Sequence, residues 1–490
     1  MIGLELSPTQ HISTALSGKN LAVPLAAMFG TVITAVSYYP GYLDGDSTWQ
    51  YRQVLSGVFN DKDPVIMAWA WSYLHRVIPG SGGLFLVTTA CFWTGLAMIV
   101  RSFTRSTLSF LFVVFFIGFF VPNFAMLSQI QKDVGMVATL LLGYGALLVA
   151  DRKRSFTALC VALLSLWYAL AVRHNSVLAA APFVVCSGYL LARDHLPVGM
   201  RKNLTTGLRK SGVGVLVLLA MIATSSLANN ALLRDTPPRY KIWLYETLFA
   251  YDLAGVAVRS GRNYLPRGHF YPARPLELAD LERLYHPHTV LFLYWGGPQE
   301  RFGAGPKERR LPMIADARLL VNLRNAWITA IVREPRAYLA HRSELFLAHL
   351  GVLEDTPYRK VQFVVWVNSN GKRVLFYPYR GPMVFDLPHN QWLTATIAKL
   401  VPTALFRPWP YLALSVVCLF FAWRWRFHFG PVALLGASSF LYTVPYAVIG
   451  VSSEFRYLWW SVVVSLLQLF IVADGVQNRP RARLPQAARG

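Results

Sequence analysis

The sequence predicts a multi-pass α-helical membrane protein with about ten transmembrane helices. Two features of the composition point to this fold class: 54% of the 490 residues are hydrophobic and only 14% are charged, too few charges for an ordinary soluble domain. In addition, the apolar residues gather in runs long enough to cross a bilayer as helices. The formal net charge is +23, but the basic residues are spread over short loops. Anionic membrane lipids are therefore expected partners, and nucleic acid is not.

Ten apolar segments have the length of about 18 to 22 residues that a membrane-spanning helix requires. They lie near 20–39, 82–100, 106–122, 134–150, 156–172, 175–192, 212–232, 409–423, 431–450 and 457–474. The stretch 64–78 is apolar but shorter, and it contains a histidine and an arginine. We expect it to form a helix in the membrane interface, a position that suits Trp69, Trp71 and Tyr73.

The basic residues fix the predicted topology, because cytoplasmic loops of membrane proteins are enriched in lysine and arginine. With a cytoplasmic N-terminus, ten spans place the basic loops 101–105, 152–154, 193–203 and 424–426 and the tail 478–483 on the cytoplasmic side. Counting 64–78 as a span would invert every later loop and destroy this bias. The outward segments are then 38–80, 123–133, 173–175, 231–405 and 451–456. The N-terminus lacks the features of a cleaved signal peptide, so the first span is expected to be retained.

Four regions follow from this topology. Residues 1–230 form a transmembrane module of seven spans with an outer loop at 40–80, residues 231–405 an outward domain, residues 406–476 the last three spans, and residues 477–490 a basic cytoplasmic tail. The outward domain is predicted to be mixed and rich in helices, with helical patterns at 235–258 and 320–354. Pro335 suits a first helical turn, and residues 361–379 fit a β-hairpin around Asn370 and Gly371.

The cysteines give little information about the compartment. All four lie inside apolar stretches, so they are interpreted as small core residues and not as a disulfide framework. They are Cys91, Cys160, Cys186 and Cys418.

Charged residues gather at the predicted outer turns, close to the membrane surface. The candidates are Asp44, Asp46, Asp63, Lys132, Asp133, Arg173, His174, Glu454 and Arg456. Several have a structural alternative: Asp44 or Asp46 suits the cap of a helix starting near Ser47, and Asp133 suits a cap of the fourth span. Asp63 followed by Pro64 fits the cap and first position of the interfacial helix.

Carboxylates and cations gathered at a lipid surface fit one chemical task. The cations hold an anionic lipid phosphate, and a carboxylate deprotonates an acceptor hydroxyl. Arg173 and His174 suit phosphate recognition, while Arg456 suits either a phosphate or the neighbouring Glu454. The pair Asp44 and Asp46 also has the spacing of a nucleotide-sugar site, but the alternating strands and helices of that fold are missing from the sequence. A sugar donor on the outer face is therefore expected to be lipid-linked.

Five short motifs occur in the order YPGYLDGDSTWQYRQVLSGVFNDKDP, QKDVGM, RHNSVL, REPRAYLAHR and EFRYLWW. In this order they resemble bacterial integral-membrane glycosyltransferases of the C-type fold (GT-C), in particular a poorly characterised subgroup with an extracytoplasmic D-S-x-x-Q stretch and a later K-D. The resemblance implies an enzyme of the bacterial inner membrane that transfers a sugar from a polyprenyl phosphate on the periplasmic side. The acceptor is a lipid, a glycan or a protein.

The resemblance also implies roles for individual residues. Asp46 matches the first-loop acid and is the preferred base, with Asp44 beside it, and Asp133 matches the second-loop acid. The residues expected to bind the donor phosphate are Lys132, Arg173, His174 and Arg456. Relatives often carry His-Pro where this chain has Asp63 and Pro64, so Asp63, like Glu454, is a candidate for binding a metal or the acceptor. Paired carboxylates serve Mg²⁺ or Mn²⁺ and acid–base chemistry equally well, so metal dependence stays open.

The expected reaction is a single displacement with inversion at the anomeric carbon. Two alternatives stay open from the sequence. An O-antigen polymerase or ligase would rely on Arg173 and His174 without a carboxylate base. A non-enzymatic transporter or flippase for lipid-linked sugars would carry polar sites near the bilayer midplane, whereas the spans here are mostly free of charge.

Overall fold

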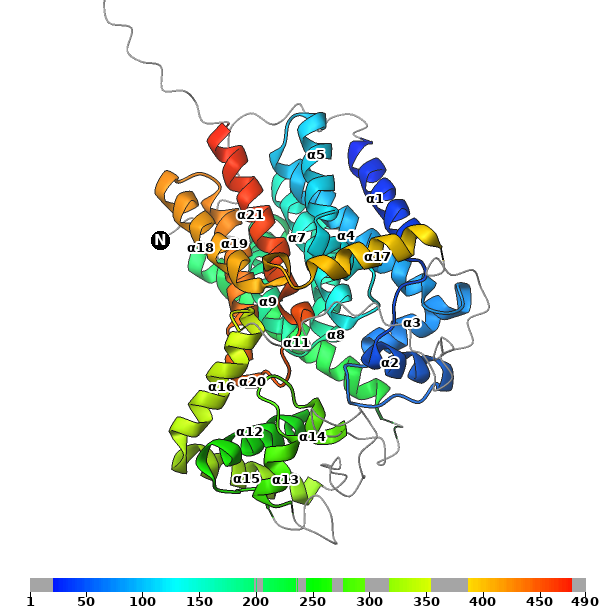
Figure 1. Cartoon of the computed structure of the whole chain (residues 1–490). Helices are drawn as coiled ribbons and strands as arrows, with labels where there is room; N and C mark the ends of the chain where they lie inside the picture. Colours follow the sequence, from blue (N-terminus) through cyan, green and yellow to red (C-terminus); the bar gives the residue numbers. More distant parts are fainter. Residues whose placement is uncertain are drawn as a thin grey trace, which may run out of the picture.

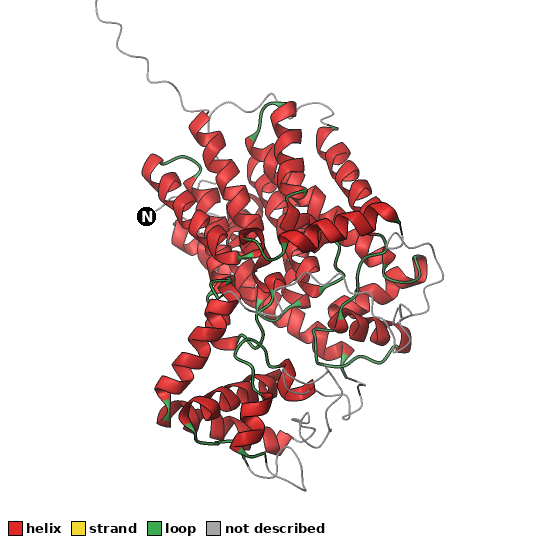
Figure 2. Ribbon diagram, viewed as in Figure 1, coloured by secondary structure: helices red, strands yellow, loops and turns green. Residues whose placement is uncertain are grey.

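The computed structural model describes residues 21–197, 200, 206–234, 236, 244–266, 276–295, 317–353 and 387–477. Among these residues the secondary structure is helical apart from two isolated β-bridges. Figures 1 and 2 show a bundle of long helices with a smaller group of helices, α12 to α16, at one end of it.

Helices occupy all ten segments predicted to span the membrane. The bundle contains α1 (Ala22–Tyr38), α4 (Gly82–Phe103), α5 (Thr107–Gly118), α6 (Val121–Leu127), α7 (Lys132–Lys153), α8 (Phe156–Val172), α9 (Ser176–Leu190) with the π-helical turn η1 (Leu191–His195), α11 (Gly207–Leu232), α18 (Pro408–Trp425), α19 (Phe429–Thr443), α20 (Tyr446–Ile449), the 3₁₀ turn η6 (Phe455–Leu458) and α21 (Trp459–Gln477). In the described part of the chain, six spans are long and apolar enough to cross a membrane, or seven with the bent pair α5 and α6. A multi-pass membrane protein is confirmed, and the number of ten spans stays a prediction.

One predicted span is broken. The segment 106–122 forms two helices, α5 and α6, that meet at 66°. Pro122 lies at the start of α6, where its missing N–H costs nothing. The Asn123 side chain donates to the Ile117 carbonyl at 2.8 Å, so a side chain at the start of α6 adds a hydrogen bond to the end of α5.

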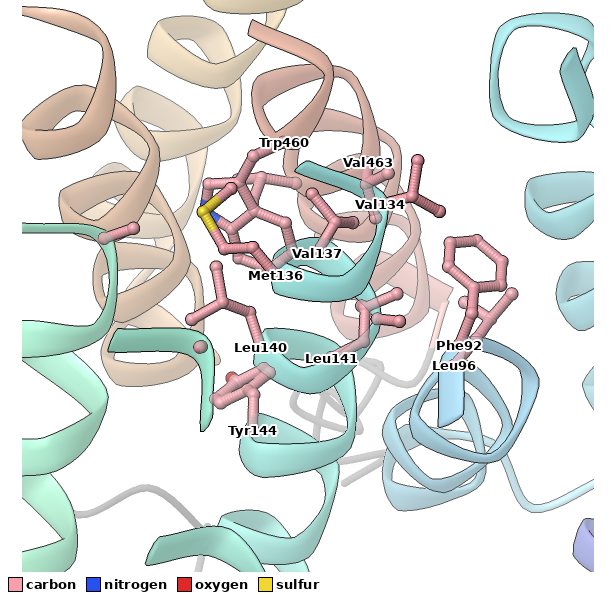
Figure 3. Close-up of a cluster of buried hydrophobic side chains, with 14 of the residues drawn as sticks. Phe92, Leu96, Val134, Met136, Val137, Leu140, Leu141, Tyr144, Trp460 and Val463 are labelled. Carbon is pink, nitrogen blue, oxygen red and sulfur yellow. The ribbon is translucent and has the colours of Figure 1, made fainter. Parts of the chain in front are cut away.

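Helix α7 lies at the centre of the bundle and positions the candidate site at its N-terminal end. Figure 3 shows side chains on two sides of α7: Met136 lies beside Trp460 of α21, and Leu141 faces Phe92 and Leu96 of α4. A Cβ at Gly95 of α4 would lie 2.4 Å from the Leu141 backbone. The two backbones therefore approach closely only because Gly95 has no side chain.

Two short helices and α17 (Pro388–Leu400) border the bundle near the candidate site. They are α2 (Gly45–Ser56) and α3 (Ile66–Val77), and α3 is the helix expected in the membrane interface. Trp69 and Tyr73 are exposed on α3, but Trp71 is fully buried. Its indole N–H donates to the Gly80 carbonyl at 2.9 Å, so Trp71 packs inside the protein and does not face the lipid as Trp69 and Tyr73 can.

The predicted capping of the interfacial helix by Asp63 and Pro64 was wrong. Helix α3 begins at Ile66, and its cap position is Val65. The backbone N–H groups of these two residues donate to the side-chain oxygen of Asn229 in α11, at 3.3 and 2.7 Å. A side chain from a distant helix thus caps α3 and leaves the Asp63 carboxylate free for an ion pair.

Helices α12 (Leu244–Ser260), α13 (Leu278–Leu284), α14 (Leu291–Trp295), α15 (Ala317–Arg333) and α16 (Pro335–Leu350) have a hydrophobic core of their own. We call them the α12–α16 unit. Pro335 occupies the first helical position of α16, as predicted. The hairpin predicted at 361–379 lies outside the described residues.

The four cysteines are free, but not all of them belong to the core. Cys186 and Cys418 are buried, Cys91 is half-buried and Cys160 is exposed. Cys160 lies between the exposed Phe156 and Leu164 on one face of α8. That face is apolar because it is available to lipid, so apolar neighbours in the sequence did not indicate burial for Cys160.

Candidate functional site

Charged side chains from five separate segments meet at one end of the bundle. They come from the start of α2 with its cap, the turn before α3, the N-terminus of α7, the turn after α8 and the start of η6 with its cap. We call them the charged cluster, which consists of Asp44, Asp46, Lys62, Asp63, Lys132, Asp133, Arg173, Glu454 and Arg456. Eight of the nine residues predicted for the site belong to it.

Arg456 connects most of the carboxylates in the cluster. Its Nη1 donates to Asp44 at 2.6 Å, its Nη2 to Asp46 at 3.0 Å, and its Nε lies 2.5 Å from Glu454. The second oxygen of Asp133 lies 3.9 Å from the same Nε. A planar guanidinium with five N–H groups is suited to join several carboxylates in this way.

Asp44 holds the turn before α2 and is fully engaged. It is the N-cap of α2 and accepts from the Ser47 backbone N–H and hydroxyl, at 2.8 and 2.7 Å. Its other oxygen accepts from Gln131 at 2.7 Å and from Arg456. The structural alternative for Asp44 is therefore confirmed, since every bond that it makes holds the fold.

Asp46 lies in the first turn of α2 and is more accessible. Its side chain is 31% exposed, and it accepts from Lys62 at 3.1 Å as well as from Arg456. Burial raises its pKa, but the positive charges of Arg456, Lys62 and Lys132 outweigh burial and hold the pKa of Asp46 below its usual range. Asp46 is thus ionised at neutral pH.

Asp133 and Arg173 form a buried ion pair between α7 and the turn after α8. Asp133 has no exposed surface, and it occupies the first turn of α7 without acting as the cap, which is Gln131. Arg173 also donates to Asn175 at 2.7 Å and to the Tyr446 hydroxyl at 2.6 Å. Each nitrogen of the Arg173 guanidinium therefore has a partner in the fold.

Lys132 and Glu454 complete the cluster. Lys132 pairs with Asp63, whose other oxygen has no hydrogen-bond partner among the described residues. Glu454 accepts from the Tyr457 hydroxyl at 3.2 Å, and burial raises its pKa above the usual value because the Arg456 charge offsets only part of the desolvation. His174 is exposed and makes none of the cluster's ion pairs among the described residues.

Sequence reasoning missed three contributors to the site. Lys62 carries a charge between Asp61 and Asp63, so the sequence did contain a signal for it. Tyr457 packs its ring 4.8 Å from the Arg173 guanidinium and 5.0 Å from that of Arg456, and Tyr446 bonds to Arg173. Tyr446 lies within a predicted membrane span, and nothing in its neighbourhood in the sequence marks it.

The carboxylates of the cluster bond to lysine and arginine side chains. Within the described part of the chain, no group of three or more His, Cys, Asp and Glu side chains is arranged to hold a metal ion.

A small, mainly apolar pocket lies beside the cluster, lined by residues of α3, α4, α6, α7 and α8 and of the turn before α7. Its lining includes Phe85, Ile130, Val134 and Tyr168. Gln131 also lines it, and the amide of Gln131 donates to Asp44. The pocket thus touches the charged cluster through Gln131, but it is too small to hold a lipid chain.

No protein-family model and no curated protein matches the chain. Among solved structures, the chain is similar to the crystal structure of ArnT from Cupriavidus metallidurans bound to undecaprenyl phosphate. The sequence identity is 14% and the TM-score is 0.31, and the match covers 93% of this chain and 78% of the other. Both values are low, and the likeness carries no weight in assigning an activity.

Proposed function

We propose that the protein is a GT-C-type membrane glycosyltransferase. It moves a sugar from a polyprenyl-phosphate donor to a lipid, glycan or protein acceptor on the periplasmic face of the inner membrane. The observation that carries this proposal is the charged cluster, in which four cations and five carboxylates meet at one end of an apolar helix bundle. Ionisable groups are costly at the edge of a membrane bundle and are retained there for function.

The donor phosphate is assigned to the more accessible cations of the cluster. The side chains of Lys62 and Lys132 are 32% and 18% exposed, whereas Arg173 and Arg456 are 9% exposed. The lysines are therefore available to bond to a phosphate oxygen. Arg456, which is more deeply buried, attracts the phosphate through its positive charge. Arg173 acts mainly by holding Asp133.

Asp46 is the preferred base because it is the most exposed carboxylate among Asp44, Asp46 and Asp133. With its low pKa it is ionised but weakly basic. A phosphate that binds Lys62 takes part of the positive charge away from Asp46 and moves its pKa upward, toward that of a more effective base. Donor binding thus activates the carboxylate that the next step needs.

In that step Asp46 takes the proton of the acceptor hydroxyl. The acceptor oxygen forms a bond to the anomeric carbon, the bond from that carbon to the phosphate oxygen breaks, and the polyprenyl phosphate leaves with the electron pair. The nearby cations stabilise its charge, and the displacement inverts the anomeric centre. The proton on Asp46 then passes to water. General-base catalysis of this kind contributes about 10² to 10⁴ in rate.

The test is glycan analysis in cells that lack the protein. Mass spectrometry of lipid A, O-antigen and periplasmic glycans identifies the sugar that is lost, and the restored wild-type chain brings it back. Asp46→Asn is expected not to restore it, whereas Glu282→Gln, on an exposed position of α13, restores it fully. Full restoration by Asp46→Asn would overturn the role of Asp46.

A second measurement separates transfer from transport. Purified protein in sealed liposomes, given the sugar-loaded polyprenyl phosphate together with the acceptor that the glycan analysis identifies, is expected to release free polyprenyl phosphate in proportion to product. Movement of the intact donor across the bilayer without this release would favour the transporter.

A further inference from the structure

The turn that carries Glu454 and Arg456 is attached to the α12–α16 unit through its backbone. We call residues 450–453 the strip. Thr289 and Ser452 form an antiparallel β-bridge. The Val290 N–H donates to the Val451 carbonyl at 2.8 Å, and the Ser453 N–H donates to the His288 carbonyl at 2.9 Å. These bonds end one residue before Glu454.

Side chains strengthen the same attachment. The hydroxyls of Thr289 and Ser452 lie 2.8 Å apart, and both residues are buried. The Val451 side chain packs against the hydrophobic core of the α12–α16 unit. The strip is thus held by the unit on its backbone and on its side chains, although it lies between two helices of the membrane bundle in the sequence.

Arg342 of α16 ties the strip to the interior of the unit. Its Nη1 donates to the Gly450 carbonyl at 2.5 Å, and its Nη2 lies 2.5 Å from Asp252 of α12. Asp252 also accepts from the Trp327 indole at 2.7 Å. Both charged residues are buried, so the guanidinium has little freedom to move away from the strip.

His349 lies two turns further along α16 and touches the aromatic side chains around the arginines. Its ring centre lies 5.2 Å from that of Tyr446 and 6.0 Å from that of Tyr457. A Cβ at Gly450 would lie 2.7 Å from the His349 Nε2, so the strip passes against this helix at a glycine. Helix α16 therefore supports both the Arg456 turn and the tyrosines that contact Arg173.

We propose that the α12–α16 unit positions Arg456, with Arg342 and Thr289 as the positioning residues, and so sets the geometry of the charged cluster. The inference rests on the proposed function, because it concerns how the same site is held in place to bind a donor phosphate. Neither residue belongs to the charged cluster itself. They act on Asp44 and Asp46 through the strip and Arg456.

Two variants weaken the attachment in different ways. Thr289→Val keeps the shape of the side chain but removes the hydroxyl that bonds to Ser452 at 2.8 Å and accepts from the Leu291 N–H at 3.2 Å. Arg342→Lys keeps a positive charge beside Asp252, so the unit stays folded, but a single ammonium does not reproduce the fork that also reaches the Gly450 carbonyl. The matched control is Arg336→Lys, on an exposed position of the same helix.

The first measurement is hydrogen exchange of the full chain in nanodiscs. Both variants are expected to speed exchange of amides in 450–458 by about two- to tenfold, the effect of losing one hydrogen bond. The exchange rates of amides in α4 and α7 are expected to stay unchanged in both variants. In the control variant, the exchange rates of 450–458 are also expected to stay unchanged. Unchanged exchange at 450–458 in both variants would overturn the inference.

The second measurement is the binding of undecaprenyl phosphate to the same samples. Both variants are expected to weaken binding by about two- to tenfold, and the control is expected not to. Faster exchange with unaltered binding would show that the unit holds the strip without setting the site, and would also overturn the inference. If the wild type binds no undecaprenyl phosphate while exchange rises as expected, the proposed donor is wrong and the attachment of the strip to the unit is supported.

Discussion

Arg456 and Asp44 are 412 residues apart in the chain, and their side chains bond at 2.6 Å. The bond joins the first turn outside the bundle to the entrance of the last helix. Arg456 also bonds to Asp46 and Glu454. One guanidinium therefore connects the segment that follows α1 with the segment that precedes α21. The charged cluster therefore exists only when the whole bundle has folded.

Replacing Arg456 is expected to destabilise the protein strongly. Arg456→Gln leaves Asp44, Asp46 and Glu454 close together without their shared cation, and breaking a buried ion pair of this kind costs about 3 to 5 kcal/mol. Arg456→Lys restores the positive charge but not the several directed hydrogen bonds. Its stability is therefore expected to lie between that of Arg456→Gln and that of the wild type. Thermal unfolding in detergent measures both. Equal stability of the Gln variant and wild type would contradict the central position given to Arg456.

Asp44 and Asp46 are expected to separate stability from activity. Asp44→Ala removes a helix cap worth about 1 kcal/mol as well as the bond to Arg456, so it lowers the unfolding temperature. Asp46→Asn keeps the fold but lowers transfer about 10² to 10⁴-fold. Asp44→Asn is the control, because asparagine still caps α2. An Asp44→Asn variant as inactive as Asp46→Asn would move the base to Asp44.

The helices were predictable because a bilayer demands long apolar runs. The break between α5 and α6 was not, since the run 106–122 is largely apolar and the sequence does not reveal the bond from Asn123 to the Ile117 carbonyl that accompanies the bend. Cys160 shows a similar limit: lipid-facing and core-facing positions carry the same residue types in a membrane helix.

For the site, topology placed the charged residues on one face but did not reveal their pairing. Lys132 was predicted to bind phosphate, and the structure pairs it with Asp63. Asn229, not Asp63, accepts from the first N–H groups of α3, so the cap that the sequence suggested does not occupy the Asp63 carboxylate. Tyr446 illustrates the same point, because its contact with Arg173 spans 273 residues.

Lys62 is expected to control the pH dependence of transfer. Asp46 has a pKa below its usual range because Arg456, Lys62 and Lys132 outweigh burial. Folding thus favours its ionised form, which stabilises the protein above the unfolded pKa of about 3.9 and is lost as the pH falls toward the folded pKa. In Lys62→Met the pKa of Asp46 rises. The acid limb of the pH–rate profile should then move to higher pH by about half a unit, a modest shift because the pair is partly exposed. A shift in the opposite direction would contradict this electrostatic role.

Tyr446 is expected to matter because its hydroxyl has several buried partners. It accepts from Arg173 and from Asn175, each at 2.6 Å, and donates to Tyr442 at 3.2 Å. Tyr446→Phe keeps the ring but leaves a buried guanidinium N–H without its acceptor, which costs about 1 to 3 kcal/mol. Tyr245→Phe, at an exposed tyrosine, is the control and should change nothing. Freed from Tyr446, Arg173 holds Asp133 less firmly, so transfer should fall together with stability. Thermal unfolding in detergent measures the stability of both variants. If Tyr446→Phe unfolds like the wild type and like the control, Arg173 does not depend on Tyr446. The ion pair of Arg173 with Asp133 is then supported by Asn175 and the Tyr457 ring.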